Sequence, residues 1–241
     1  MNRYHLPSEQ WSGDMLVLTG DEAKHCARVM RATIGETVEL FDGAGRSAIC
    51  QIESISNQKI HCQIQSQEHL TTGGASIHLC QAIPKGGNME LIVQKAVELG
   101  VASIQPIITE HTVARPEQVE KKRLKWQRIA LEACKQCGQN TLPEVKPVLS
   151  FGEWITQPHE GARVIAAIHP QARSMQSVVP HLAEGASLLV GPEGDFSLTE
   201  YELALDNGFM PVTLGNIILR TETATLYCLS VLQYELRGKE E

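Results

Sequence analysis

The length, composition and charge of the chain exclude several classes of protein. Its 241 residues suit one large domain, or a small domain joined to a medium one, and no apolar run approaches the ~18 residues of a membrane span. A hydrophobic fraction of 42% with 20% charged residues is ordinary for a globular protein, and the first residues lack the apolar stretch of a signal peptide. We therefore expect a cytoplasmic protein without a membrane partner.

The net charge of −7 disfavours a nucleic-acid partner, because phosphates attract basic proteins. The distribution of charge weakens that exclusion, since residues 1–72 are acidic overall and residues 111–147 are basic. Basic residues gather where a helix is expected to open, at Lys121, Lys122, Arg123, Lys125 and Arg128. Such a run is most often a solvated helix face. Charge alone therefore does not decide between RNA and other partners.

Residues 1–72 are expected to form a small β-barrel. Alternating apolar residues predict strands at 37–41, 48–55 and 59–64. A helical stripe predicts one helix from Asp21 to Met30. The segment 71–74 is typical of a linker.

The segment from Gly43 to Ala48 matches the dinucleotide-binding fingerprint G-x-G-x-x-[GA]. That fingerprint needs a following helix, whose N-terminus holds the pyrophosphate. An alternating strand follows here, so we interpret the glycines as a hairpin turn. This removes the main support for a nucleotide-dependent oxidoreductase.

From Ser76 onward the pattern changes to strands that alternate with helices. Expected strands are 77–83, 103–108, 144–148, 163–168, 187–190 and 210–214. One expected helix stops at Gly100, a second runs from Pro116 to Gly138, and the last begins near Thr221. Capping boxes match at Ser150 with Glu153 and at Ser197 with Glu200. The alternation indicates a parallel α/β sheet, whose ligands bind beyond the carboxyl ends of the strands.

The seven cysteines are spread over the whole chain and do not resemble a disulfide framework. Cys134 and Cys137 form a C-x-x-C pair, which has no second pair or paired histidines to complete a zinc site. Both fall on an expected helix, where Cys137 continues an apolar stripe. We favour buried packing over redox chemistry, and no metal is expected.

Two segments that follow expected strands are candidate sites. Gly191-Pro192-Glu193-Gly194 precedes a capped helix and, alone, would most often be an ordinary turn. The segment 214–224 places three large aliphatic residues after Gly215, followed by Arg220 and Glu222. An apolar loop at a strand end suits a flat ligand such as adenine, whose edge backbone amides can bind. The structural alternative is a loop that plugs the core, with an Arg220–Glu222 pair at the surface.

These two segments, in this order and spacing, resemble the RsmE family of SPOUT-class methyltransferases. The likeness continues along most of the chain, through Arg3-Tyr4, His25-x-x-Arg28-Val29-x-Arg31, Leu40-Phe41-Asp42-Gly43, Lys85, Met89-Glu90, Gln94-Lys95, Glu98-Leu99-Gly100, Trp126, Glu132-Ala133, Gln136 and His169-Pro170. Each motif alone is weak evidence, whereas the ordered set is strong.

The resemblance implies a PUA-like RNA-binding β-barrel at residues 1–72 and a SPOUT methyltransferase domain at residues 73–241. It also implies a C-terminal trefoil knot, which is a rare exception to the rule that chains do not thread loops. The implied activity is transfer of a methyl group from S-adenosylmethionine to N3 of one uridine in 16S ribosomal RNA of the small subunit. The family acts as a homodimer, for which the helix 223–236 is a candidate interface, although core packing explains its stripe equally well.

The same resemblance implies roles for individual residues. Backbone groups would bind S-adenosylmethionine at Ile168, His169, Val190, Gly191, Leu214, Gly215, Ile218, Leu219 and Arg220. Arg220 would also stabilise negative charge on uracil, and Glu193 and Glu222 are candidate bases, although Glu193 could instead hold its turn through backbone hydrogen bonds. Phosphate contacts are expected from Arg3, Arg28, Arg31 and Lys85, with the 121–128 cluster extending the track.

Two positions depart from the family pattern. Glycine is usual where Asp195 stands, so a carboxylate lies beside the implied cofactor loop unless it faces solvent. Arginine is common near Gln139, so one candidate RNA contact is missing.

The competing hypotheses are a non-enzymatic RNA-binding protein of ribosome assembly, which needs no cofactor pocket, and a SPOUT enzyme that methylates ribose 2′-oxygen or transfer RNA.

Overall fold

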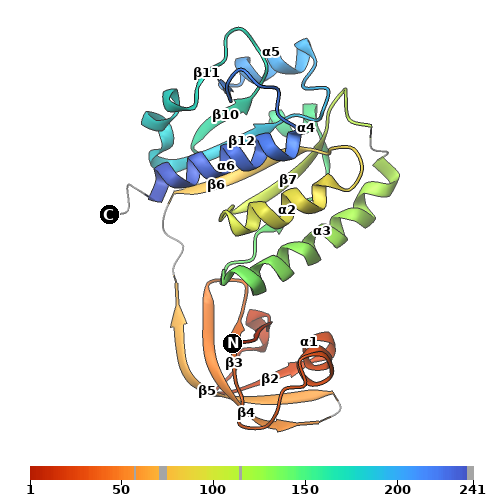
Figure 1. Ribbon diagram of the computed structural model, residues 1–241, viewed down its shortest axis with the longest axis vertical. Coiled ribbons are helices and arrows are strands. Elements are labelled where there is room, and N and C mark those ends of the chain that lie inside the picture. Colours follow the sequence, from red (N-terminus) through yellow and green to blue (C-terminus); the bar gives the residue numbers. More distant parts are fainter. Residues whose placement is uncertain (57, 71–74, 114–115, 238–241) are drawn as a thin grey trace. The chain divides into compact units, whose positions relative to one another are not determined.

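The computed structural model describes residues 1–56, 58–70, 75–113 and 116–237 (Figure 1). The chain forms two compact units: the first comprises Met1–Gly73 and Cys134–Leu142, and the second Gly74–Ala133 and Pro143–Glu241. The sequence pattern gives no sign that residues 134–142 belong with the first unit. The expected linker at 71–74, and with it the expected boundary between residues 72 and 73, lies outside the described residues.

The first unit is built on a five-stranded sheet in the order β1-β3-β4-β5-β2. Its strands are β1 (Arg3–His5), β2 (Met15–Thr19), β3 (Thr37–Phe41), β4 (Arg46–Ile55) and β5 (Lys59–His69). β1 pairs with β3 in parallel, and the other ladders are antiparallel. Successive side chains of a strand point to opposite faces, so alternate residues meet in one apolar core, which includes Val38, Leu40, Cys50, Ile52, Ile60 and Cys62.

The glycine-rich turn between β3 and β4 is a hairpin, as predicted, because the two strands pair directly across it. The Asp42 carboxylate accepts hydrogen bonds from the backbone N–H groups of Ala44 (2.7 Å) and Arg46 (2.9 Å), which fixes the turn. Gly45 has a φ of 106°, and a Cβ there would lie 2.5 Å from the carbonyl oxygen of Leu70. The glycine is therefore required by the turn and not by a nucleotide.

The helix predicted at 21–30 is present, but it is not regular throughout. A short 3₁₀ turn, η1 (Ser8–Gln10), and strand β2 precede α1 (Gly20–Lys24), which continues as the π-helical segment η2 (His25–Val29). Ala23 and Cys26 bury their side chains in the core of the first unit, as the stripe predicts. The helical segment ends before Arg31, whose φ of 54° is left-handed.

The second unit is a parallel α/β domain, as the alternation predicts. Its eight-stranded sheet has the order β11-β13-β10-β12-β6-β7-β8, with β9 also paired to β7, and every ladder among the described residues is parallel. Its strands are β6 (Ser76–Ala82), β7 (Ser103–Ile108), β8 (Glu144–Val145), β9 (Leu149–Ser150), β10 (Ala162–Ala166), β11 (Arg173–Ser174), β12 (Gly185–Val190) and β13 (Met210–Thr213). The strand predicted at 144–148 is shorter and ends before Pro147, which has no N–H for a ladder.

Helices cover both faces of this sheet. α2 (Asn88–Glu98) and α6 (Thr221–Arg237) lie side by side on one face, as Figure 1 shows. α4 (Phe151–Ile155) and α5 (Leu198–Asp206) share a core cluster with Cys80 of β6. Gln81, the next residue of β6, points to the opposite face of the sheet, where its Oε1 accepts a hydrogen bond from the hydroxyl of Thr225 in α6. Short 3₁₀ helices, η3 (Met175–Ser177) and η4 (Val179–Glu184), precede β12.

Both predicted capping boxes are confirmed. Ser150 with Glu153 opens α4, and Ser197 with Glu200 opens α5, each with reciprocal side-chain and backbone hydrogen bonds. The last helix begins at Thr221, as predicted. Within the described ranges, no helix is both long and apolar enough to cross a membrane.

The glycine stops are confirmed, but one prediction about α3 is wrong. Gly100 follows α2 with a φ of 79°, and Gly138 follows α3 (Pro116–Cys137) with a φ of 88°. Cys134 is buried as expected, whereas Cys137 is exposed. Cys137 lies on the same helix face as the buried Ala133 and Cys134, but it is the last residue of α3, and the burial of this face ends before it.

Candidate active site

Three adjacent strands of the second unit end together at one edge of the sheet. The strand order places β10 between β12 and β13, and Ala166, the last residue of β10, is in register with both Val190 and Val212. The segments that follow these strands therefore emerge side by side, where ligands of parallel sheets bind. They line a cavity of about 410 Å³. This volume lies in the usual range of small-molecule sites.

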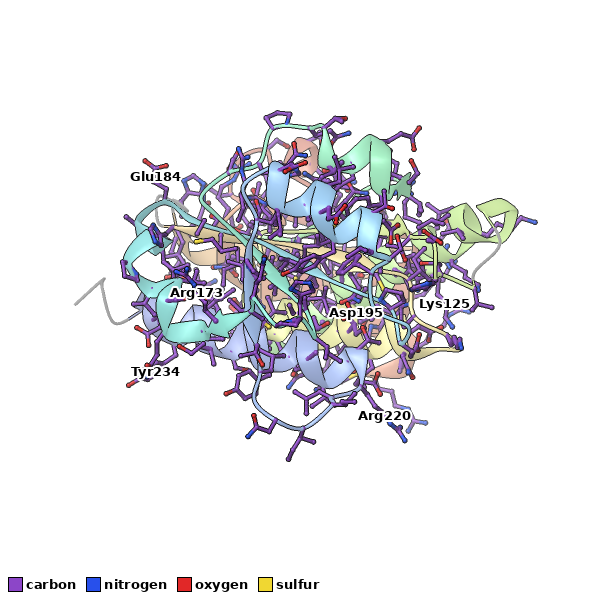
Figure 2. The ribbon with its side chains drawn as sticks, turned by 90° about the horizontal axis from the view of Figure 1, so that it is seen from above. Lys125, Arg173, Glu184, Asp195, Arg220 and Tyr234 are labelled. Carbon is purple, nitrogen blue, oxygen red and sulfur yellow. The ribbon has the colours of Figure 1, made fainter. Side chains whose placement is uncertain are left out.

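The cavity gathers most of the residues that the sequence suggested for cofactor binding. Eight of the nine line it: Ile168, His169, Val190, Gly191, Leu214, Gly215, Ile218 and Leu219. Arg220 does not belong to the lining and is exposed. Figure 2 shows its side chain projecting at the periphery, whereas Asp195 lies further in.

The loop after β13 forms a wall of this cavity and does not plug the core. Ile217 and Ile218 are 77% and 79% exposed, so the core-plugging alternative is wrong. Gly215, with a φ of 109°, turns the chain out of the strand. The loop consequently offers aliphatic side chains to a ligand that enters the cavity.

The turn after β12 requires a small residue at its first position. A Cβ on Gly191 would lie 3.1 Å from the ring of Phe196 and 3.2 Å from Oδ1 of Asp195. The backbone N–H of Asp195 closes the turn on the carbonyl of Pro192 at 3.0 Å. Gly191 therefore belongs to the geometry of the turn, and it also exposes backbone to the cavity.

A buried polar network lies beneath this turn, and sequence reasoning missed it. The hydroxyl of Thr221 donates to the carbonyl of Gly191 at 2.6 Å, and the side-chain amide of Gln81 donates to Thr221 Oγ1 at 3.2 Å. The hydroxyl of Thr225 donates to Gln81 Oε1 at 2.6 Å. Buried polar groups need such partners. The sequence offered one signal of this network, which is Gln81, a polar residue inside the apolar run of β6.

The carboxylate of Glu193 holds the backbone of a neighbouring loop. Its Oε1 and Oε2 accept hydrogen bonds from the N–H of Lys85 at 2.9 and 3.2 Å. This is the alternative role that the sequence left open, in which Glu193 stabilises loop structure. Glu222 is half-buried and accepts a hydrogen bond from Nδ2 of Asn88 at 3.3 Å. Glu193 therefore contacts the segment between β6 and α2, and Glu222 contacts the first residue of α2.

Asp195 lines the cavity and does not simply face solvent. Its φ of 57° is left-handed, a conformation that glycine adopts freely and that aspartate tolerates better than most residues. Its Oδ2 accepts the N–H of Ile168 at 3.1 Å, and its Oδ1 accepts the N–H of Phe196 at 2.9 Å. Nδ1 of His111 lies 2.9 Å from the carbonyl of Asp195 and can donate to it. This hydrogen bond raises the pKa of His111.

Arg3 lies inside the first unit and not on its surface. Its side chain is 7% exposed, and its Nε pairs with Glu39 at 2.9 Å. One Nη donates to the carbonyl of Cys134 at 2.8 Å, the other to Oδ1 of Asn140, and the guanidinium lies 4.6 Å above the ring of Phe41. These internal partners correct the expected phosphate contact, because they give Arg3 a structural role.

The other expected RNA contacts are available to a partner. Arg28 and Arg31 are exposed in the first unit, and the side chain of Lys85 is exposed in the second. In the 121–128 cluster, Arg123 donates to the carbonyl of Val145 at 3.2 Å and Lys125 pairs with Glu90 at 2.5 Å. Lys121, Lys122 and Arg128 are exposed. Half-buried Gln139, the second departure, has its backbone carbonyl 3.4 Å from Arg3.

Comparison with known families identifies both parts of the chain. Residues 73–233 match the family model of an RNA methyltransferase domain, and residues 18–65 match that of an RNA methyltransferase PUA domain. A parallel α/β domain with a strand-end cavity, in one chain with a PUA sheet, thus defines an RNA methyltransferase. Among the described residues, no group of three or more His, Cys, Asp and Glu side chains gathers as metal ligands would.

Individual relatives are similar over nearly the whole chain. Ribosomal RNA small subunit methyltransferase E of Bacillus subtilis is 31% identical and covers 92% of each chain. Its crystallised namesake from Neisseria gonorrhoeae, bound to S-adenosyl methionine, is 33% identical with a TM-score of 0.87 over 97% of both chains. A methyltransferase of Legionella pneumophila, in complex with the cofactor SAM, is 35% identical with a TM-score of 0.86 over 96% of both chains. The chain belongs to the family of ribosomal RNA small subunit methyltransferase E.

Proposed function

We propose that this chain is an S-adenosylmethionine-dependent methyltransferase that modifies N3 of one uridine in the 16S RNA of the small ribosomal subunit. The observation that carries the proposal is the cavity at the ends of β10, β12 and β13. Two relatives named for small-subunit ribosomal RNA support it, one of them crystallised with S-adenosyl methionine, and so does a further methyltransferase solved in complex with the same cofactor. The position on the base rests on the resemblance of the ordered motifs.

The cavity suits this cofactor in size and in chemistry. Its volume of about 410 Å³ accommodates a nucleoside with a short side chain. Ile218 and Leu219 would offer apolar contact to a flat base, and the resemblance implies that peptide groups at Val190, Gly191 and Gly215 would bind its polar edges. When bound, the cofactor supplies a methyl group that its sulfonium already activates.

The residues around Thr221 are proposed to contact the uracil base and to assist removal of its N3 proton. Thr221 lines the cavity, and Arg220 and Glu222 flank it in sequence. Arg220 would stabilise negative charge on the uracil carbonyls, and Glu222 would accept the N3 proton. Glu193, which lines the cavity and whose two carboxylate oxygens accept the N–H of Lys85, is the other candidate base. Holding N3 in line with the methyl group would supply much of the rate.

RNA binding is proposed to use exposed basic residues of each unit. Arg28 and Arg31 would contact phosphates from the PUA unit, and Lys85 and the 121–128 cluster would do so from the methyltransferase unit. Substituting Glu for Arg28 or Lys85 should weaken RNA binding and reduce its dependence on salt. Unchanged RNA binding would show that the substituted residue does not contact the phosphates.

A homodimer is proposed through α6. Tyr227 and Tyr234 on this helix are 47% and 78% exposed, and they border a groove of about 660 Å³ that Met175 and Leu214 also line. Leu214 belongs to the cofactor cavity as well. A partner seated on α6 would thus touch the loop that holds the cofactor. Tyr234→Glu should shift the protein from dimer to monomer in sedimentation experiments.

The resemblance also supports two further proposals about the architecture of the chain. One is the division of the chain into a PUA-like region at 1–72 and a SPOUT domain at 73–241. The other is a trefoil knot in the C-terminal segments. Slow refolding of the full chain that is abolished by cutting the loop after β13 would support the knot.

The test of the proposed function is methylation of small-subunit RNA and of assembled small subunits with labelled cofactor, followed by nucleoside analysis. We expect label in 3-methyluridine, and its loss in Arg220→Ala despite retained binding of cofactor and RNA. Label in a 2′-O-methyl nucleoside or in transfer RNA would establish the alternative SPOUT activity. Failure to bind the cofactor in calorimetry, with RNA binding intact, would instead indicate a non-enzymatic RNA-binding protein.

A further inference from the structure

The walls of the candidate cofactor cavity carry negative charge. Among the described residues that line it, Glu193 and Asp195 are acidic and none is a lysine or an arginine. His169 also lines the cavity, and its ring stacks on Tyr201 with the centroids 4.0 Å apart. An acidic wall in a mostly apolar cavity favours a ligand with a positive centre.

Asp195 is fixed in this wall by its own hydrogen bonds. Its carboxylate joins the turn after β12 to the loop after β10, because it accepts the N–H groups of both Phe196 and Ile168. These two bonds offset the cost of a left-handed backbone at a residue other than glycine. Each carboxylate oxygen has further acceptor capacity that these bonds do not use. A fixed charge with free lone pairs therefore borders the ligand volume.

The charge of Asp195 acts where water screens it only partly. Asp195 is half-buried beside Phe196 and Tyr201, which are 9% and 5% exposed. The pKa of Tyr201 is raised, first by burial and then by the negative charge of Asp195. The hydroxyl of Tyr201 is buried without a hydrogen-bond partner among the described residues. Electrostatic interactions are stronger in such surroundings than at an open surface.

We infer that Asp195 makes the cavity selective for charge, so that a ligand with a cationic sulfonium binds more tightly than the neutral thioether left after methyl transfer. This inference rests on the proposed function, which identifies the ligand. In the transfer, the bond from uridine N3 to the methyl carbon forms as the sulfur–methyl bond breaks. The sulfur keeps the electron pair of that bond and loses its positive charge, and the N3 proton leaves to a base. The acidic wall would then favour exchange of spent cofactor for fresh cofactor.

Calorimetric titration with S-adenosylmethionine and with S-adenosylhomocysteine tests this selectivity. Asp195→Asn preserves the size, the tolerance of a left-handed backbone and one hydrogen-bond acceptor, but removes the charge. We expect the Kd for S-adenosylmethionine to rise roughly three- to tenfold and the Kd for S-adenosylhomocysteine to change less than about twofold. Asp206→Asn is the matched control, because Asp206 is exposed at the end of α5 and does not line the cavity. It should change neither Kd.

Two results would overturn the inference. An equal loss of affinity for both ligands in Asp195→Asn would mean that the residue only maintains the shape of the turn. Unchanged affinity for both ligands would mean that the charge of Asp195 does not contribute to their binding. If the unsubstituted protein bound neither ligand, the proposed function itself would fail, and the inference with it.

Discussion

The hydroxyl of Thr221, the first residue of α6, donates a hydrogen bond of 2.6 Å to the carbonyl of Gly191 in the turn after β12. Both residues line the cavity, and both are buried. This bond therefore connects the last helix of the chain to the turn that borders the proposed cofactor. Stability and ligand binding should depend on it together.

Thr221→Val should lower the free energy of unfolding by about 1–3 kcal/mol, because the Gly191 carbonyl and the Gln81 amide both lose a buried partner. Valine has nearly the same shape, so the loss reports the hydrogen bonds. Urea denaturation measures it, and calorimetry should show weaker cofactor binding. Thr223→Val is the control, since Thr223 is exposed on the same turn of helix. Equal effects of the two substitutions would contradict this role.

Arg3→Ala should destabilise the first unit by about 3 kcal/mol, because Glu39 would be left without its partner in a largely buried site. RNA affinity, measured where the variant is still folded, should change little. Arg28→Ala, at an exposed position, should do the opposite and weaken RNA binding with little change in stability. If Arg3→Ala instead kept normal stability but lost RNA binding, that result would support the phosphate contact that the sequence suggested.

The pKa of His111 is raised, chiefly by its hydrogen bond to the carbonyl of Asp195 and further by that to Gly194. A raised pKa in the folded state means that the protonated imidazole stabilises the fold. This contribution is complete below the unfolded pKa of about 6.5 and is lost as the pH rises through the folded pKa. An NMR titration should place His111 above the reference value, and His111→Gln should remove this component from the pH dependence of thermal unfolding. A midpoint at or below the reference value would refute the bond.

Gly45→Ala should cost about 2–4 kcal/mol, because the new Cβ would lie 2.5 Å from a backbone oxygen of Leu70 at a φ of 106°. Gly13→Ala is the comparison, since Gly13 also has a positive φ, of 67°, but nothing lies within 4 Å of its Cβ position. That variant should lose only about 1 kcal/mol. Chemical denaturation measures both, and equal losses would mean that the hairpin tolerates a side chain.

Native alkylation should label Cys137 rapidly and the other six cysteines slowly. Cys137 is exposed, whereas burial raises the pKa of Cys134 to about 12 and lowers its access to reagent. Mass spectrometry should find one fast adduct per chain, and Cys137→Ser should remove it. Fast modification of Cys134 as well would show that the two cysteines behave as a reactive pair.

The elements of the second unit could be predicted because their signals are local. A capping box such as Ser197 with Glu200 involves four consecutive residues, and Gly100 needs a left-handed φ where it stands. The hairpin at Gly45 was likewise predictable from the strand that follows it. The strand order is not local, since β12 pairs with both β6 and β10. Candidate loops could be identified from the residues at the strand ends, but only the resemblance joined them into one site.

The errors of prediction arose where a tertiary partner decides the role of a polar or exposed residue. Arg3 resembles a phosphate ligand in sequence, but Glu39 and the carbonyl of Cys134 engage it from distant segments. Cys137 fits an apolar stripe, yet the helix ends there and leaves it exposed. Gln81 carries no motif, and its function appears only when α6 packs on β6.

The position of β13 beside β10 has a consequence for how the protein folds during its synthesis. The wall formed by residues 213–219 and the anchor at Thr221 come after both β10 and β12 in the sequence. A ribosome-bound nascent chain can complete the strands β1 to β5 early, but it cannot assemble the cavity until the segment through Thr221 has been synthesised. The proposed enzyme would therefore be unable to capture its cofactor before that segment has been made. Removal of α6, which carries Thr221 and Ala224 of the cavity lining, would leave the cavity incomplete.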